Sequence, residues 1–155
     1  MKKCIVCFLM IILFAALVTG CSFKKSRNEN IMKYELQTHE YFSGFNHNTN
    51  KFYIDSEEEL EEFYSLFSDT LNIDKTYLKD NTIFIQVKQV GSGSIKMKLE
   101  DVTFDNNTVN FSITEDIPEM GTDDMACWYL VAIIPNHKLQ GIKFDEWIKP
   151  SKVTV

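Results

Sequence analysis

Residues 127–134 read Cys-Trp-Tyr-Leu-Val-Ala-Ile-Ile, an unbroken apolar run rich in β-branched and aromatic side chains. Such side chains favour strands. An apolar run of this length that ends at a turn signal is typical of a strand buried on both faces. The turn signal here is Pro135-Asn136, which follows directly. We therefore expect residues 127–134 to form a central strand of a β-sheet, with other parts of the chain covering both faces.

A predicted hairpin precedes this strand. Residues 95–100 alternate between apolar and charged side chains, as an antiparallel strand with one solvated face does. The apolar phase then slips by one position, which predicts a bulge or bend near Glu100-Asp101. Residues 105–107, Asp-Asn-Asn, suit a tight turn because Asn tolerates positive φ. Residues 109–113 alternate again and form the predicted return strand.

A helix is predicted over about residues 56–68. Ser56 and Glu59 have the spacing of a capping box at a helix N-terminus. The apolar side chains that follow recur at the i, i+3, i+4, i+7 spacing of one buried helix face. Further strands are expected at residues 31–41, 52–54, 83–88, 142–148 and 153–155. The predicted fold class is α+β and mostly β: an antiparallel sheet or β-sandwich with one amphipathic helix packed on it.

The N-terminus carries the features of a secretory signal peptide. Lys2 and Lys3 precede an apolar run from Cys4 to Val18, and small residues lead to Cys21. The ending Leu17-Val18-Thr19-Gly20-Cys21 resembles the lipobox of bacterial lipoproteins. That resemblance implies cleavage between Gly20 and Cys21 and a diacylglycerol thioether on Cys21.

The resemblance implies a lipid-anchored protein on the extracytoplasmic face of the cell membrane. Residues 1–20 are then the signal peptide, residues 21–30 a flexible tether, and residues 31–155 a single β-rich domain. The alternative is an uncleaved transmembrane helix, but spanning a bilayer takes about 20 apolar residues. Either interpretation places the domain outside the cytoplasm.

Charge and cysteine placement narrow the class of protein further. The formal net charge of −6 becomes −8 when Lys2 and Lys3 leave with the signal peptide. This acidic net charge disfavours nucleic acid as a partner, because nucleic acids select basic patches.

Cleavage and lipidation would leave Cys127 as the one free cysteine of the mature chain, so no intrachain disulfide is expected. Cys127 is interpreted as a small buried hydrophobe, with a reactive thiol as the alternative.

A search for catalytic motifs predicts a protein that is not an enzyme and needs no cofactor. His39, His47 and His137 lack a second ligand at zinc spacing. The sequence contains no nucleophile elbow and no phosphate-binding glycine loop. Residues 115–124 hold five carboxylates. They are expected to form an exposed acidic loop, with a calcium site as the alternative.

The order of predicted strands and loops from Thr82 to Pro135 resembles the C-terminal domain of the protease complex subunit PrcB family. That family has a T-G-G-Y-like motif after its first strand, at the position of Gly91-Ser92-Gly93-Ser94-Ile95 here. Its P-x-x-G loop corresponds to Pro118-Glu119-Met120-Gly121. The aromatic residue of the glycine motif is absent, because Ile95 stands in its place. The resemblance implies a non-enzymatic accessory domain that binds or matures a partner protein, such as an exported protease.

The sequence thus predicts a membrane-anchored lipoprotein whose domain binds another envelope or exported protein. The expected partner-contact loops are residues 91–94 (Gly91, Ser92, Gly93, Ser94) and a second loop that begins with residues 118–121 (Pro118, Glu119, Met120, Gly121). Two alternatives stay open at this point. One is an extracytoplasmic β-domain that inhibits proteases, and the other is a lipoprotein that binds a small solute or calcium.

Overall fold

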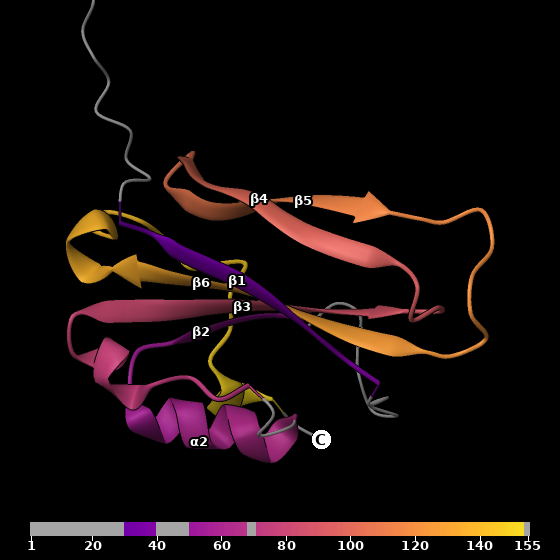
Figure 1. Ribbon diagram of the computed structural model, residues 1–155. Helices are drawn as coiled ribbons and strands as arrows, with labels where there is room; N and C mark the ends of the chain where they lie inside the picture. The colour runs from indigo at the N-terminus through magenta and orange to yellow at the C-terminus, as the bar shows by residue number, and fades with distance from the viewer. Residues whose placement is uncertain (1–29, 40–49, 68–70, 154–155) are drawn as a thin grey trace, which may run out of the picture.

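The computed structural model describes residues 30–39, 50–67 and 71–153 (Figure 1). These residues form six strands, one α-helix and three short 3₁₀-helices. Their bounds are β1 Met32–Thr38, β2 Lys51–Ile54, α2 Glu57–Leu66, η1 Lys75–Lys79, β3 Asn81–Val90, β4 Lys96–Asp105, β5 Thr108–Asp116, β6 Ala126–Pro135, η2 Asn136–Lys138 and η3 Pro150–Lys152. The predicted fold class is confirmed: the structure is mostly β, with antiparallel sheets and one α-helix in the described residues.

Strand β6 is central, as its apolar sequence predicts. Four strands form one antiparallel sheet in the order β1-β6-β3-β2, so β6 is hydrogen-bonded on both sides. The other two strands form a separate antiparallel hairpin, β4-β5. Every residue of β6 from Ala126 to Ile134 is buried. Cys127 is among them and is fully buried, which confirms its interpretation as a core residue.

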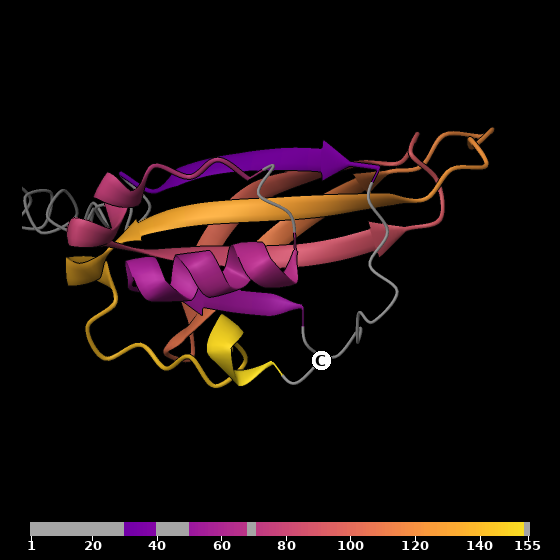
Figure 2. The ribbon, with the colours of Figure 1, turned by 90° about the horizontal axis from the view of Figure 1, so that it is seen from below.

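The two faces of β6 belong to two different cores. Side chains on one face, including Tyr129 and Val131, pack with Phe52, Leu60 and Phe63 beneath α2. Side chains on the other face, including Trp128 and Leu130, pack against the β4-β5 hairpin. Figure 2 shows the resulting layers, with α2 on one side of the four-stranded sheet and the hairpin on the other. An unbroken apolar strand is needed here because neither face of β6 meets water.

Helix α2 starts at the predicted cap. Ser56 has extended backbone dihedrals, and its Oγ accepts a hydrogen bond from the Glu59 N–H. The buried face carries Leu60 and Phe63. The Glu59 carboxylate accepts hydrogen bonds from Ser151 N and Oγ. The N-terminal cap was therefore predictable from local sequence, whereas the contact of Glu59 with η3 was not.

The β4-β5 hairpin follows the sequence closely. Its register shifts between Leu99 and Asp101, so the predicted bulge is confirmed. Asn106 and Asn107 have φ angles of 52° and 59°, the left-handed pair that a tight two-residue hairpin turn requires. Both turn residues are asparagines because Asn adopts this conformation more readily than most side chains.

The predicted strand at residues 142–148 is wrong. This segment forms only isolated bridges, Thr108 with Lys143 and Phe52 with Ile148. Turns interrupt it, because Trp147 N bonds to Phe144 O. Its apolar residues instead fill the side of the core between β2 and the hairpin, where Trp147 Nε1 donates to Val109 O at 3.0 Å. They pack into the core without a sheet neighbour along the length of the segment.

Other predicted boundaries shift at their ends. The first strand spans Met32–Thr38 rather than residues 31–41, and residues 40–41 lie outside the described part of the chain. No closing strand forms at Val153, which follows η3, and residues 154–155 are not described. The predicted signal peptide, Cys21 and most of the predicted tether also lie outside the described residues. Among the residues that are described, no helix is long and apolar enough to cross a membrane.

Candidate functional site

Two loops converge at one end of the molecule, and we call them together the tip: residues 91–95, between β3 and β4, and residues 117–125, between β5 and β6. The strand register brings them together, because Val90 pairs with Ala126 and Lys96 pairs with Asp116. Figure 1 shows both loops at the end of the sheet opposite the start of β1. The structure therefore places the two predicted partner-contact loops side by side.

The Ser92 hydroxyl joins the two loops. The Thr122 N–H donates to Ser92 Oγ at 2.8 Å and to Ser94 Oγ at 3.1 Å. Ser92 Oγ also lies 2.8 Å from Ser94 Oγ and 3.1 Å from Thr122 Oγ1. Ser92 is only 9% exposed although it is polar and lies in a loop. A hydroxyl can donate once and accept twice, so this one side chain fastens the long loop to the short one.

A close approach between Gly93 and Asp124 makes a second connection. The Gly93 N–H donates to the Asp124 backbone oxygen at 2.8 Å and to its Oδ1 at 3.1 Å. A Cβ at position 93 would lie 2.4 Å from Asp124 Oδ2, so only glycine fits without displacing that carboxylate. Hydrogen bonds from the Thr122 side chain and then from the Gly93 N–H hold the pKa of the Asp124 carboxyl below its usual value.

Side chains from β1, β4 and β6 support the tip from beneath. Gln37 Nε2 donates to Gly93 O at 2.6 Å, and Lys96 Nζ donates to Gln37 Oε1 at 3.0 Å. Trp128 Nε1 donates to Ile95 O at 3.2 Å. The short loop is thus held by the sheet beneath it as well as by the long loop. Its backbone is fixed from several directions.

His39 contacts the same carboxylate from the end of β1. Its Nδ1 lies 3.3 Å from Asp124 Oδ2, and both side chains are largely exposed. An exposed pair of this kind contributes little to stability. Ser92 Oγ is bonded to hydroxyl and backbone N–H groups, and the His39 imidazole contacts Asp124 and not this hydroxyl. Ser92, Thr122, Asp124 and His39 therefore form a structural hydrogen-bond network.

Large apolar side chains emerge from the long loop of the tip. Met120 is 88% exposed, Ile117 66% and Met125 50%. Five carboxylates accompany them between residues 115 and 124. Glu115 pairs with Lys88 at 2.5 Å. The outer side of the tip therefore combines apolar side chains with negative charge, above a base that is held by hydrogen bonds.

Both predicted partner-contact segments lie in loops of the tip, and the hydrogen bonds that join them were not predictable from the sequence. Residues 91–94 and 118–121 both belong to the tip. Gln37 and Trp128 escaped sequence reasoning, because they lie 56 and 33 positions from the loop residues that they bind. No local pattern signals such contacts. Gly20 and Cys21, the predicted cleavage and lipid sites, lie outside the described residues.

Metal binding has no geometric support in the described part of the chain. No group of three or more His, Cys, Asp or Glu side chains there is arranged to hold a metal ion. Within the acidic segment, Glu115 is bonded to Lys88, and Asp124 is bonded to Gly93. Calcium binding by residues 115–124 stays an untested alternative.

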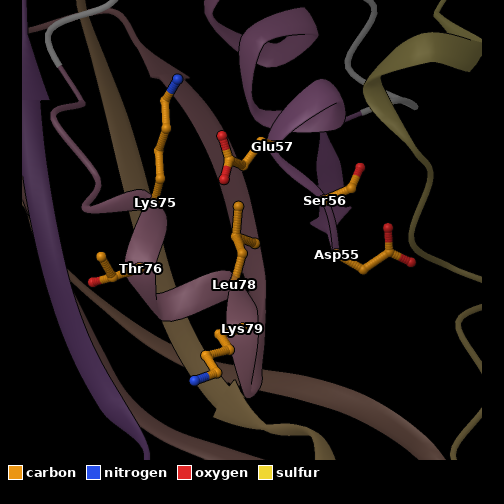
Figure 3. A pocket seen from close by; sticks show the side chains of 7 residues that line it. All are labelled: Asp55, Ser56, Glu57, Lys75, Thr76, Leu78 and Lys79. Atoms are coloured by element: carbon orange, nitrogen blue, oxygen red, sulfur yellow. The ribbon is translucent and has the colours of Figure 1, made fainter.

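A hollow of about 380 Å³ lies between the start of α2 and η1 (Figure 3). Its lining includes Asp55, Ser56 and Lys75. These groups already serve the fold: Asp55 pairs with Lys149 at 2.8 Å, Ser56 caps α2, and Lys75 pairs with Glu61. The hollow combines charges of both signs without a group aimed at a ligand. We therefore take the tip as the candidate functional site.

Comparisons of the chain with protein-family models, curated proteins and solved structures found no match.

Proposed function

We propose that this chain is a lipid-anchored extracytoplasmic protein whose β-rich domain binds another envelope protein through the tip. The observation that carries the proposal is the architecture of the tip itself. Its base is fastened by the Ser92 network, yet its outer side exposes Ile117, Met120 and Met125. A fixed loop that holds apolar side chains in water is typical of a protein-binding surface.

The position of the anchor supports this use of the tip. The proposed lipid on Cys21 precedes β1, and β1 starts at Met32, paired with Ile133 near the end of β6. The tip instead lies beside Ala126, where β6 begins. A strand of seven residues such as β1 spans roughly 23 Å. An anchor on the chain before β1 would therefore be attached at the end of the sheet opposite the tip and would leave the tip accessible (Figure 1).

The resemblance to the PrcB family suggests which kind of partner the tip would bind. Both segments that carry the resemblance, residues 91–95 and 118–121, belong to the tip. In that family the domain is a non-enzymatic accessory to a protease. We propose the same class of role here, with an exported protease as the first partner to test.

Inhibition of a protease is the second candidate, and one observation favours it. Met120 is the most exposed large apolar side chain of the loop, and Thr122, two positions further on, is fastened to Ser92 and Ser94. Inhibitor loops that are held in their bound conformation bind with a smaller entropic cost. A panel of extracellular proteases, assayed with the purified full chain, separates this role from that of an accessory subunit.

Site-specific crosslinking in cells tests the proposed function. A photo-crosslinking residue at Met120 of the full chain is expected to capture one dominant envelope or exported protein, identified by mass spectrometry. The matched control carries the same residue at Glu58, which is exposed on α2 away from the tip. Absence of a partner specific to position 120, in cells that express and anchor the protein, would overturn the proposal.

A further inference from the structure

Most of the exposed large hydrophobic residues in the described chain lie in the long loop of the tip. Four large hydrophobic residues of the described chain are exposed: Met32, Ile117, Met120 and Met125. Three of them lie within one nine-residue loop. Single exposed hydrophobics are ordinary on protein surfaces, so the concentration of three in one loop distinguishes the tip from the rest of the described surface. Two of the three are methionines, whose unbranched thioethers adapt to the shape of a partner.

Negative charge surrounds this cluster and is only partly neutralised. Residues 91–95 and 115–125 contain no lysine or arginine. Glu115 pairs with Lys88, and Asp124 bonds to Gly93 and His39. The remaining acids of the segment, Asp116, Glu119 and Asp123, form no ion pair among the described residues. Lys96 lies opposite Asp116 in the strand register, but its Nζ bonds to Gln37.

The charge also excludes one kind of occupant. Anionic lipid headgroups attract basic segments, so an acidic loop is unsuited to such a membrane surface. The tip also lies at the end of the sheet opposite the start of β1, where the proposed anchor is attached. The complement to carboxylates around apolar side chains is a protein segment with lysine or arginine beside apolar residues.

We infer that the tip binds a cationic segment of a partner protein. Apolar side chains of that segment lie against Ile117, Met120 and Met125, and its lysines or arginines face Asp116, Glu119 and Asp123. This inference rests on the proposed function and names the chemistry of the partner. Because the Ser92 network already fixes the base of the loop, little ordering is needed on binding.

Defined peptides test the chemistry directly. The full lipidated chain, in nanodiscs of phosphatidylcholine, carries a photo-crosslinking residue at Gly91, where a Cβ meets nothing within 4 Å. Three peptides of equal length are compared: alternating Lys-Leu, Glu-Leu and Lys-Ser. We expect the Lys-Leu peptide to crosslink at least about tenfold more than either other peptide, because it alone matches both charge and apolar contact. A crosslinker at Glu58 on α2 should capture none of them.

Matched variants then assign the effect to the tip. Combined Asp116→Asn, Glu119→Gln and Asp123→Asn substitutions should lower the Lys-Leu crosslink about tenfold, as should Ile117→Ser with Met120→Ser. As a control, combined Glu57→Gln, Glu58→Gln and Glu62→Gln substitutions remove the same amount of charge from α2. They should leave the yield of the Lys-Leu crosslink unchanged. Equal capture of the Glu-Leu peptide, or full capture by the neutralised tip, would overturn the inference.

Failure of the inference is distinguishable from failure of the proposed function. If the neutralised tip still captures the cellular partner from position 120, the proposed function stands and the cationic partner segment is wrong. If no cellular partner is captured from the unaltered tip, the proposed function fails, whatever the peptides do.

Discussion

At the scale of single residues, the tip depends on side chains chosen for their size as much as for their polarity. Ser92 supplies one oxygen that meets two hydroxyls and the Thr122 N–H. Gly93 supplies an amide whose neighbour leaves no room for a methyl group. A side chain at position 93 would displace the Asp124 carboxylate from the Gly93 N–H. The conformation of the short loop is therefore coupled to that of the long one.

Substituting Gly93→Ala tests this close packing. The added Cβ would displace the exposed Asp124 carboxylate and break its hydrogen bond from the Gly93 N–H, so we expect a loss of about 0.5–1.5 kcal/mol in the free energy of unfolding. Gly91→Ala is the matched control, because a Cβ there meets nothing within 4 Å and should leave stability unchanged. Urea unfolding followed by tryptophan fluorescence measures both. Equal stability of the two variants would contradict the assigned role of Gly93.

A buried phenol predicts alkaline sensitivity. Burial raises the pKa of Tyr34 to about 12 from 10.0, with smaller contributions from Tyr64 and Tyr77. The unfolded chain releases this proton near pH 10 and the folded chain near pH 12. Stability should therefore fall as pH rises between these values, because the folded state binds more protons.

The Tyr34→Phe variant identifies the group responsible. It should lose a tyrosine component that titrates near pH 12 in ultraviolet absorbance and show a weaker fall in stability above pH 10. Tyr53→Phe should retain that component. Retention of the late titration in Tyr34→Phe would show that another tyrosine is responsible.

At the scale of elements, side chains of β1 close the edge of the β4-β5 hairpin. Glu35 Oε1 accepts from the Leu99 N–H at 2.7 Å, and Lys33 Nζ donates to Glu100 O. Both contacts fall at the bulge, where the register of β4 shifts. The bulge thus turns backbone groups of an edge strand towards β1, and polar side chains satisfy them. An edge that is satisfied in this way is less available for pairing with another chain.

Glu35 provides the test of this closure. Glu35→Ala removes the acceptor of the Leu99 N–H, and we expect a cost of about 1–3 kcal/mol in the free energy of unfolding. Glu35→Gln retains a carbonyl oxygen and should recover most of that loss. Glu62→Ala, on the exposed side of α2, should be nearly neutral. The same urea unfolding assay compares all three, and equal costs for Ala and Gln at position 35 would contradict the closure.

The elements also show where local sequence is informative. The β4-β5 hairpin, its bulge and its Asn-Asn turn were predictable because alternation and turn chemistry act between neighbours in the chain. The cap of α2 was predictable for the same reason. Residues 142–148 misled because their apolar side chains fill the core beside β2 and the hairpin without pairing as a strand. Apolar side chains indicate that a segment is buried, but hydrogen bonding to a neighbouring strand depends on the whole fold.

At the scale of the whole molecule, the proposed function gives the domain a direction. The chain enters β1 at one end of the sheet, and the tip lies at the other (Figure 1). A lipid on Cys21 would attach the domain through the first end. The proposed binding surface would then lie at the end away from the attachment point, accessible to other envelope proteins.

The anchor is tested by Cys21→Ser in the full chain. We expect loss of metabolic labelling with radioactive palmitate, because the thioether that begins lipid attachment can no longer form. Lipid-dependent cleavage after Gly20 should stop as well, leaving a chain longer by the signal peptide. Cys127→Ser is the matched control and should be labelled as the unaltered protein is. Persistent labelling of Cys21→Ser would refute the lipid anchor.

The sequence by itself determined the six strands β1–β6, the helix cap, the hairpin turn and the central place of residues 127–134, although it also predicted a strand at residues 142–148 that does not form. These features depend on interactions between residues a few positions apart, or on burial that an unbroken apolar run predicts directly. Only the tertiary structure decided that residues 91–95 and 117–125 meet, that Gln37 and Trp128 hold them, and that Ile117 and Met120 are left exposed. Those contacts join residues about 30 to 60 positions apart, so they exist only when the register of β3, β5 and β6 brings the strand ends together.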